Sequence, residues 1–104
     1  MRRRLVYGHL SVPVILSEEM TKRQDGEYRA DPRCITLNPE LRGYELLNTL
    51  IHEMAHAFLA LDGLTGEGEM LSQDQEEAVC NCVGNRMSEA LMRNKWLRDL
   101  VGEL

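Results

Sequence analysis

The sequence predicts an α+β fold, with a small N-terminal antiparallel sheet of about three strands followed by two long helices. Before residue 43, short β-branched runs alternate with turn dipeptides. From 43 to 61, apolar residues recur with the 3.6-residue period of a helix, and a second helical pattern begins near residue 73. The 104 residues are enough for one compact domain, so we expect residues 1–104 to form a single minimal domain.

Three segments of the first part are predicted to be strands. The run VPVIL at 12–16 is β-branched, and Pro13 confines it to a sheet edge or a strand start. GEYRA at 26–30 and RCITLN at 33–38 flank the turn dipeptide Asp31-Pro32, which predicts a hairpin. The triplet of arginines at 2–4 is expected to be a solvated N-terminus.

The first helix is predicted at about 43–61. Its period indicates a well-buried helix, and Gly63 after Asp62 is a plausible stop signal. The apolar residues that set the period are Leu46, Leu47, Leu50, Ile51, Met54, Ala55, Phe58 and Leu59.

A glycine-rich loop at 63–71 precedes the second helix, which is predicted at about 73–94. Ser72 fits an N-cap, and Gln75 completes a capping-box pattern. The last ten residues either continue this helix or form a short one, with Trp96 and Leu100 packing back on the body. One apolar or small stripe is predicted along the second helix, at Val79, Cys80, Val83, Gly84, Met87, Ala90 and Leu91.

Composition excludes several classes of function. The net charge is −5, so neither nucleic acid nor an anionic membrane is an expected partner. No apolar run approaches the roughly 18 residues that span a bilayer, and no signal peptide is visible. Three cysteines form no disulfide framework, which favours the cytoplasm.

The first helix carries His52-Glu53-Met54-Ala55-His56, the H-E-x-x-H pattern. Residues four apart lie on one helix face, so both imidazoles can bind one metal ion. Glu53 is rotated about 100° from His52 and suits a general base that holds a metal-activated water. We therefore predict one Zn²⁺ per chain, bound by His52 and His56, with Glu53 as the catalytic residue.

A catalytic zinc site usually has a third protein ligand, and the second helix offers two carboxylates. Glu76 lies in the predicted apolar stripe, whereas Glu77 projects with the polar face. Burial of Glu76 is costly unless a cation offsets it, so we favour Glu76 over Glu77 as the third metal ligand. Cys80 is expected in the core, and Cys80 and Cys82 point in nearly opposite directions and cannot easily bind one ion.

The stretch NTLIHEMAHAFL, followed about 20 residues later by EEAV, resembles small gluzincin-type zinc metallopeptidases. It is similar to the ImmA/IrrE family and related phage and prophage proteins. The resemblance implies a sheet before two helices, H-E-x-x-H on the first and a glutamate ligand on the second, matched here by Glu76. It covers roughly residues 26–94, and this chain lacks the further helices or domains usual in that family.

ITLNP and LLNTLIHEMAHAFL are also similar to SprT-like metalloproteases, whose third histidine lies in a G-H-G-like loop. Here that loop reads Gly66-Glu67-Gly68, without the histidine, so Glu67 is an outside candidate ligand.

The predicted function is zinc-dependent hydrolysis of peptide bonds in a protein or peptide substrate. The substrate is expected to pair along the strand at 33–38, and Tyr28, Tyr44 and His9 are weak candidates for the oxyanion donor. Two alternatives are a non-catalytic regulatory or interaction module with a structural zinc site and a metal-free helical module. The sequence predicts neither cleavage specificity nor oligomeric state.

Overall fold

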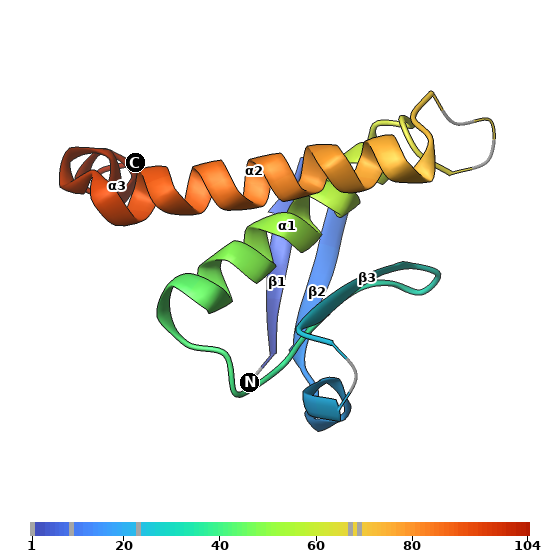
Figure 1. Cartoon of the computed structure of the whole chain (residues 1–104), viewed down its shortest axis with the longest axis horizontal. Helices are drawn as coiled ribbons and strands as arrows, with labels where there is room; N and C mark the ends of the chain where they lie inside the picture. Colours follow the sequence, from blue (N-terminus) through green and yellow to red (C-terminus); the bar gives the residue numbers. More distant parts are fainter. Residues whose placement is uncertain (1, 9, 23, 67, 69) are drawn as a thin grey trace.

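The computed structural model of the chain describes residues 2–8, 10–22, 24–66, 68 and 70–104 and has an α+β fold, as predicted (Figure 1). Helix α1 packs against the sheet on one side and against α2 on another. The elements are β1 (Arg2–Tyr7), β2 (Leu10–Leu16), a short 3₁₀ helix η1 (Glu18–Lys22), β3 (Gly26–Ala30), β4 (Arg33–Leu37), α1 (Gly43–Leu61), α2 (Gln73–Arg93) and α3 (Lys95–Gly102).

The sheet has four strands in the order β1-β2-β4-β3, one more than predicted. The sequence prediction missed β1, because its three arginines were interpreted as a solvated terminus. Arg4 is exposed, and its guanidinium donates a hydrogen bond of 2.9 Å to Ser11 Oγ across the β1–β2 pair. The sheet is also mixed and not purely antiparallel, because β2 and β4 run parallel.

The parallel pair corrects two expectations. β2 is an interior strand that begins at Leu10, whereas Pro13 predicted an edge strand or a strand start. The proline precedes the segment Val14–Leu16 that pairs with β4, so at Pro13 the strand is paired with β1 alone. β4 is interior too and has no free edge for a substrate. The strand with one unpaired edge beside α1 is β3, which pairs only with β4.

The core lies between the sheet and α1. β4 alternates as predicted, because Ile35 and Leu37 are buried while Cys34 and Thr36 are less so. Ala57 of α1 and Val12 of β2 complete the buried cluster. Tyr7 at the end of β1 stacks on Phe58 with ring centroids 5.2 Å apart, which ties the edge strand to the end of α1.

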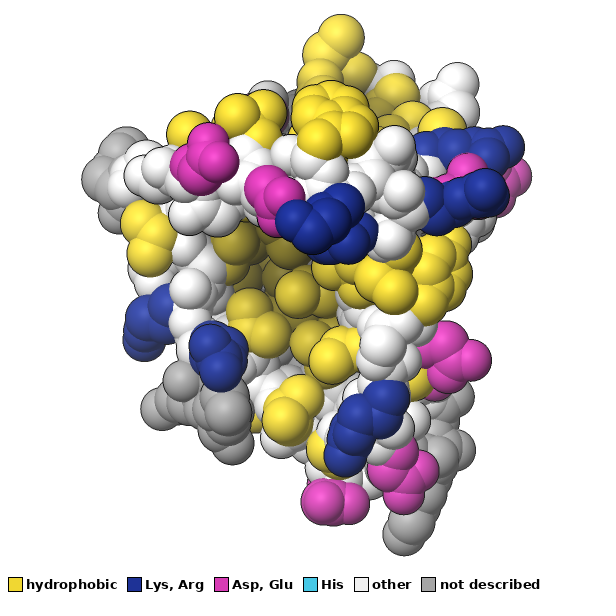
Figure 2. Space-filling model, turned by 90° about the vertical axis from the view of Figure 1, so that its left-hand side faces the viewer, with side chains coloured by type: hydrophobic (Ala, Val, Ile, Leu, Met, Phe, Trp, Pro, Cys, Tyr) yellow, Lys and Arg dark blue, Asp and Glu magenta, His cyan; other side chains and the backbone are white. Residues whose placement is uncertain are grey.

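The C-terminal region does not pack back as predicted. Trp96 is 66% exposed and Leu100 is 50% exposed, so the apolar side chains of α3 are largely open to solvent. Figure 2 shows apolar side chains gathered on this side of the molecule, around a hollow. Among the described residues, no helix is both long and apolar enough to cross a membrane.

Candidate metal centre

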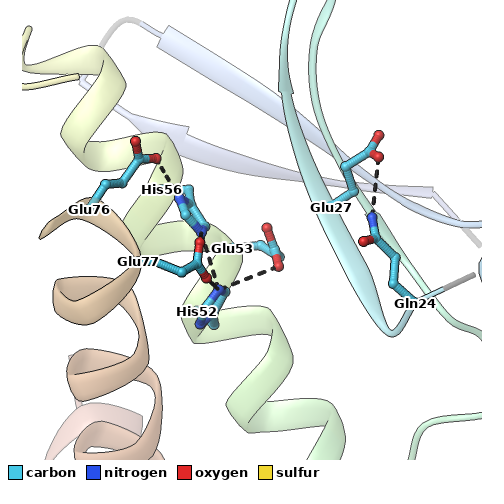
Figure 3. Close-up of polar contacts among 7 residues, drawn as sticks. All are labelled: Gln24, Glu27, His52, Glu53, His56, Glu76 and Glu77. Atoms are coloured by element: carbon cyan, nitrogen blue, oxygen red, sulfur yellow. Dashed lines mark hydrogen bonds and ion pairs between the residues drawn. The ribbon is translucent and has the colours of Figure 1, made fainter. Parts of the chain in front are cut away.

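The two histidines of the motif lie one turn apart on α1, and both rings are turned towards α2 (Figure 3). Their Nε2 atoms are 3.1 Å apart, and the ring planes are inclined at 67°. Each side chain is mostly buried, at 18% exposure for His52 and 14% for His56. The same nitrogen of each ring is therefore aimed at one small volume between the helices.

Glu77 from the first turns of α2 completes this cluster. Its Oε1 lies 3.0 Å from His52 Nε2, and its Oε2 lies 3.3 Å from His56 Nε2. The start of α2 is fixed by the predicted capping box: the Gln75 amide donates to Ser72 Oγ, and the Ser72 amide donates to Gln75 Oε1. In the part of the chain that the structure describes, His52, His56 and Glu77 form the one group of three or more residues whose potential metal ligands lie within 4.8 Å of one another.

The spacing of these atoms fits a small divalent cation. Ligand atoms about 2.0–2.1 Å from a tetrahedral ion lie about 3.3 Å from one another. Here the two Nε2 atoms lie 3.1 Å apart, and they lie 3.0 and 3.3 Å from the two different oxygens of Glu77. With one ligand atom taken from each residue, all three atoms lie within 4.8 Å of one another. Two imidazole nitrogens and a carboxylate are also the donor set of catalytic zinc sites, so the three residues could hold such an ion with one position left open.

Glu76 occupies a different position from the one predicted. Its Oε2 lies 2.6 Å from Nδ1 of His56, the ring nitrogen that faces away from the cluster. The His56 Nδ1–H donates to this carboxylate, which leaves the lone pair of Nε2 free for a metal ion. Glu76 thus contacts the outer ring nitrogen of His56, whereas Glu77 contacts the Nε2 atoms of both rings.

The predicted stripe along α2 is confirmed in part: Cys80 and Gly84 are buried, Ala90 and Leu91 are half-buried, and Ser88 is buried as well. The side chain of Glu76, on the same side of the helix, is 24% exposed, whereas that of Glu77 is 53% exposed. Val79, Val83 and Met87, which the prediction counted as core, are 36–46% exposed.

Glu53 lies beside the cluster on the side that faces β3 (Figure 3). Its Oε2 is 3.9 Å from His52 Nε2, and the residue is only 7% exposed. Burial raises the pKa of Glu53 to about 7, while the nearby His56 and a backbone hydrogen bond from Tyr28 act in the opposite direction. A carboxylate whose pKa is near neutrality is suited to accepting and returning a proton at physiological pH.

A pocket of about 370 Å³ opens in front of the cluster, between the helices and β3. Gln24, Gly26, Glu27 and Tyr28 form its far wall. Of these four residues, only Tyr28 was predicted from the sequence as a candidate site residue, because the other three belong to no recognisable motif.

Two glycines let the neighbours of α1 approach the motif closely. A Cβ at Gly26 would lie 2.7 Å from Thr49 Cγ2 and 3.2 Å from Glu53 Cγ. A Cβ at Gly84 would lie 2.8 Å from Asn48 Oδ1 and 3.2 Å from His52 Cβ. The absence of side chains at these two glycines lets β3 approach Glu53 and α2 approach His52.

The other residues predicted from the sequence lie in different parts of the molecule. Tyr28 lines the pocket, whereas Tyr44 is 40% exposed and its hydroxyl donates to the Asn85 carbonyl at 3.4 Å. Glu67 and His9 lie outside the described residues. Cys80 is fully buried, as predicted, and burial raises the pKa of its thiol to about 12.

Comparison with known protein families, with curated proteins and with solved structures found no match to this chain.

Proposed function

We propose that this protein is a zinc-dependent metallo-endopeptidase, with His52, His56 and Glu77 as the metal ligands and Glu53 as the general base. The observation that carries the proposal is that the two Nε2 atoms lie 3.1 Å apart and that both face the Glu77 carboxylate, at 3.0 Å from Oε1 and 3.3 Å from Oε2. A divalent cation shared by the two Nε2 atoms and the carboxylate would account for all three contacts at once.

The contacts favour Glu77 as the third ligand and Glu76 as a positioning residue. Glu77 contacts the Nε2 atom of both rings, and Glu76 contacts only Nδ1 of His56. Carboxylates that accept a hydrogen bond from the second nitrogen of a metal-bound histidine fix its tautomer and raise its basicity. The predicted resemblance to gluzincin-type peptidases of the ImmA/IrrE group is retained as part of the proposal, with the ligand moved by one residue.

The chemistry divides between the ion and the chain. A bound divalent cation polarises a water molecule and a substrate carbonyl. Glu53 accepts the proton of the attacking water and delivers it to the leaving amine, for which its position and raised pKa are suited. The Tyr28 hydroxyl is the favoured donor to the developing oxyanion, because Tyr28 lines the pocket and Tyr44 is not among the pocket's lining residues.

The substrate strand is proposed to lie along β3. This strand borders the pocket and has one edge without a partner strand, so an extended peptide can pair with its backbone. The predicted pairing with residues 33–38 is replaced, because β4 is paired on both sides.

The test separates a catalytic from a structural role for the metal. We expect the purified protein to bind one zinc per chain and to cleave denatured protein substrates. Glu53→Gln should retain zinc and lose at least about 100-fold of the activity, because general base catalysis contributes about that much. Equal cleavage by Glu53→Gln and the parent would favour the non-catalytic module, and absence of zinc would favour the metal-free one.

A matched pair of variants tests the assignment of the two glutamates. Glu77→Gln should weaken zinc binding severely, since it removes an anionic ligand. Glu76→Gln should weaken it by about 10- to 100-fold, since the His56 ring loses a charged acceptor but keeps its ligand atom. Isothermal titration with zinc measures both, and the opposite order of effects would return the ligand role to Glu76.

The cytoplasm is the proposed compartment. Cys34, Cys80 and Cys82 are all free thiols, and proteins that keep unpaired cysteines are typical of reducing compartments.

A further inference from the structure

The metal pocket is the middle section of a longer groove. On one side, a pocket of about 300 Å³ shares Gly26, His52 and Glu53 with it. On the other side, a pocket of about 370 Å³ shares Tyr28 and Glu76 with it. The three pockets therefore follow β3 from Gly26 to Ala30 and continue on both sides of the proposed catalytic centre.

The acidic groups in the middle of this groove already have partners. Glu76 and Glu77 contact the histidines, and Glu53 hydrogen-bonds to the backbone of Tyr28. Glu27 accepts hydrogen bonds from Arg29 and Gln24. A substrate therefore meets little uncommitted charge in the middle section.

The two ends of the groove differ in charge. Among the described residues that line the three pockets, Arg33 is the one lysine or arginine, and it lies at the Ala30 end. Asp25 lies at the Gly26 end, together with the polar amides of Asn81 and Asn85. Both charged side chains are exposed, and no salt bridge to another described residue involves either one. One end is thus suited to a carboxylate and the other to an ammonium, a guanidinium or an amide.

We propose that the groove selects an extended peptide of opposite charge at its two ends, with an acidic side chain against Arg33 and a basic or amide side chain against Asp25. This inference rests on the proposed function and deepens it, because it names the class of substrate. Four residue steps separate Gly26 from Ala30, which is about 13 Å of extended chain. The two charged substrate residues should therefore lie about four positions apart, on either side of the bond that is cut.

The experiment measures peptide binding without turnover. The zinc-loaded Glu53→Gln protein is titrated into fluorescent peptides that carry one Lys and one Glu about four residues apart, in both orders, and into a peptide with Gln at both positions. Fluorescence anisotropy gives the affinity of each peptide. We expect one order to bind about three- to tenfold more tightly than the other, with the difference shrinking at high salt, because the contacts are between exposed charges.

Charge reversal identifies the residues responsible. Arg33→Glu should abolish or invert the preference at the acidic position of the peptide, and Asp25→Lys should do so at the basic position. Arg86→Glu and Asp99→Lys are matched controls: they reverse exposed charges on α2 and α3, each near an opposite charge outside the groove, and they should leave the preference intact.

The outcomes distinguish this inference from the proposed function when the unmodified, zinc-loaded protein is assayed on the same peptides. Cleavage without charge preference overturns the inference and leaves the hydrolase standing. Charge-selective binding without cleavage supports the groove and overturns the hydrolase. If the peptides are neither bound nor cleaved, or if Arg86→Glu removes the preference as fully as Arg33→Glu, the inference is overturned.

Discussion

The body of α2 and its C-terminal end have different surroundings, although one continuous helix connects them. As far as Ser88, the helix packs against α1, and Cys80, Gly84 and Ser88 are buried. Its last turn leads into α3, and there Met92 is 48% and Trp96 66% exposed. The polar and charged groups of the candidate site thus lie at the packed body of α2, while much of the exposed apolar surface belongs to the C-terminal end. Fold stability and metal binding should therefore respond strongly to changes in the first region and weakly to changes in the second.

The largest expected effect is on the pH dependence of the free energy of unfolding, and it arises from Glu53 in the metal-free protein. In the unfolded chain this group ionises near its ordinary pKa of 4.5, whereas in the folded protein its pKa is about 7. Between those values the folded state binds more protons, so the free energy of unfolding falls as the pH rises from 4.5 to 7. The loss attributable to Glu53 should be about 2–3 kcal/mol.

Urea denaturation with a chelator present, repeated across this pH range, measures the loss. His56 on α1, Glu77 on α2 and Glu27 on β3 also face Glu53, so the comparison with Glu53→Gln isolates its contribution. The variant should be more stable than the parent above pH 7, and the two should converge near pH 4.5. A constant difference at every pH would show that Glu53 does not titrate with folding.

The second prediction compares the effect on stability of a glycine-to-alanine substitution at Gly84 in α2 and at Gly102 in α3. Gly84→Ala adds a Cβ that would lie 2.8 Å from Asn48 Oδ1, 3.2 Å from His52 Cβ and 3.3 Å from the Asn48 carbonyl oxygen. The Asn48 side chain must therefore shift, and we expect α2 to move away from α1 by a few tenths of an ångström. We expect a net loss of about 1–2 kcal/mol, because overpacking outweighs the higher helix propensity of alanine. Gly102→Ala in α3 meets no atom within 4 Å and should cost nothing.

Measuring zinc affinity distinguishes a displacement of Glu77 at the site from a general loss of protein stability. If α2 moves, Glu77 moves away from the histidines, and the zinc affinity of Gly84→Ala should fall even where the protein is fully folded. The affinity of Gly102→Ala should equal that of the parent. Equal affinities for all three proteins would show that the close crossing at Gly84 does not position the ligand.

The sequence predicted the elements whose signals are local. The bounds of α1, the capping box of α2 and the hairpin of β3 and β4 agree with the structure because periodicity, Ser72 and Asp31-Pro32 lie within or beside them. The parallel pairing of β2 with β4 was not predictable, because it joins segments separated by a helix and another strand. Register and strand order depend on tertiary packing, which leaves no local trace in residues 12–16.

The choice between Glu76 and Glu77 shows a further limit. They precede the buried Cys80 by four and three residues, which places them about 40° and 60° to either side of it on the helix. Helical phase alone therefore cannot separate them. Only the contacts between α1 and α2 distinguish them: Glu77 contacts both Nε2 atoms, and Glu76 contacts Nδ1 of His56.

The smallest effect on the free energy of unfolding is expected from a substitution in α3, at the exposed C-terminal end. Trp96→Ser removes a large apolar side chain that is 66% exposed, so the free energy of unfolding should change by no more than about 0.5 kcal/mol. Zinc affinity should be unchanged, because α3 contributes none of the proposed ligands. Chemical denaturation at two protein concentrations measures the change and also detects self-association through Trp96, which would make the parent's stability depend on concentration. A loss above about 1.5 kcal/mol that is independent of concentration would contradict the contrast between the body of α2 and its C-terminal end, because α3 would then be an integral part of the packed body.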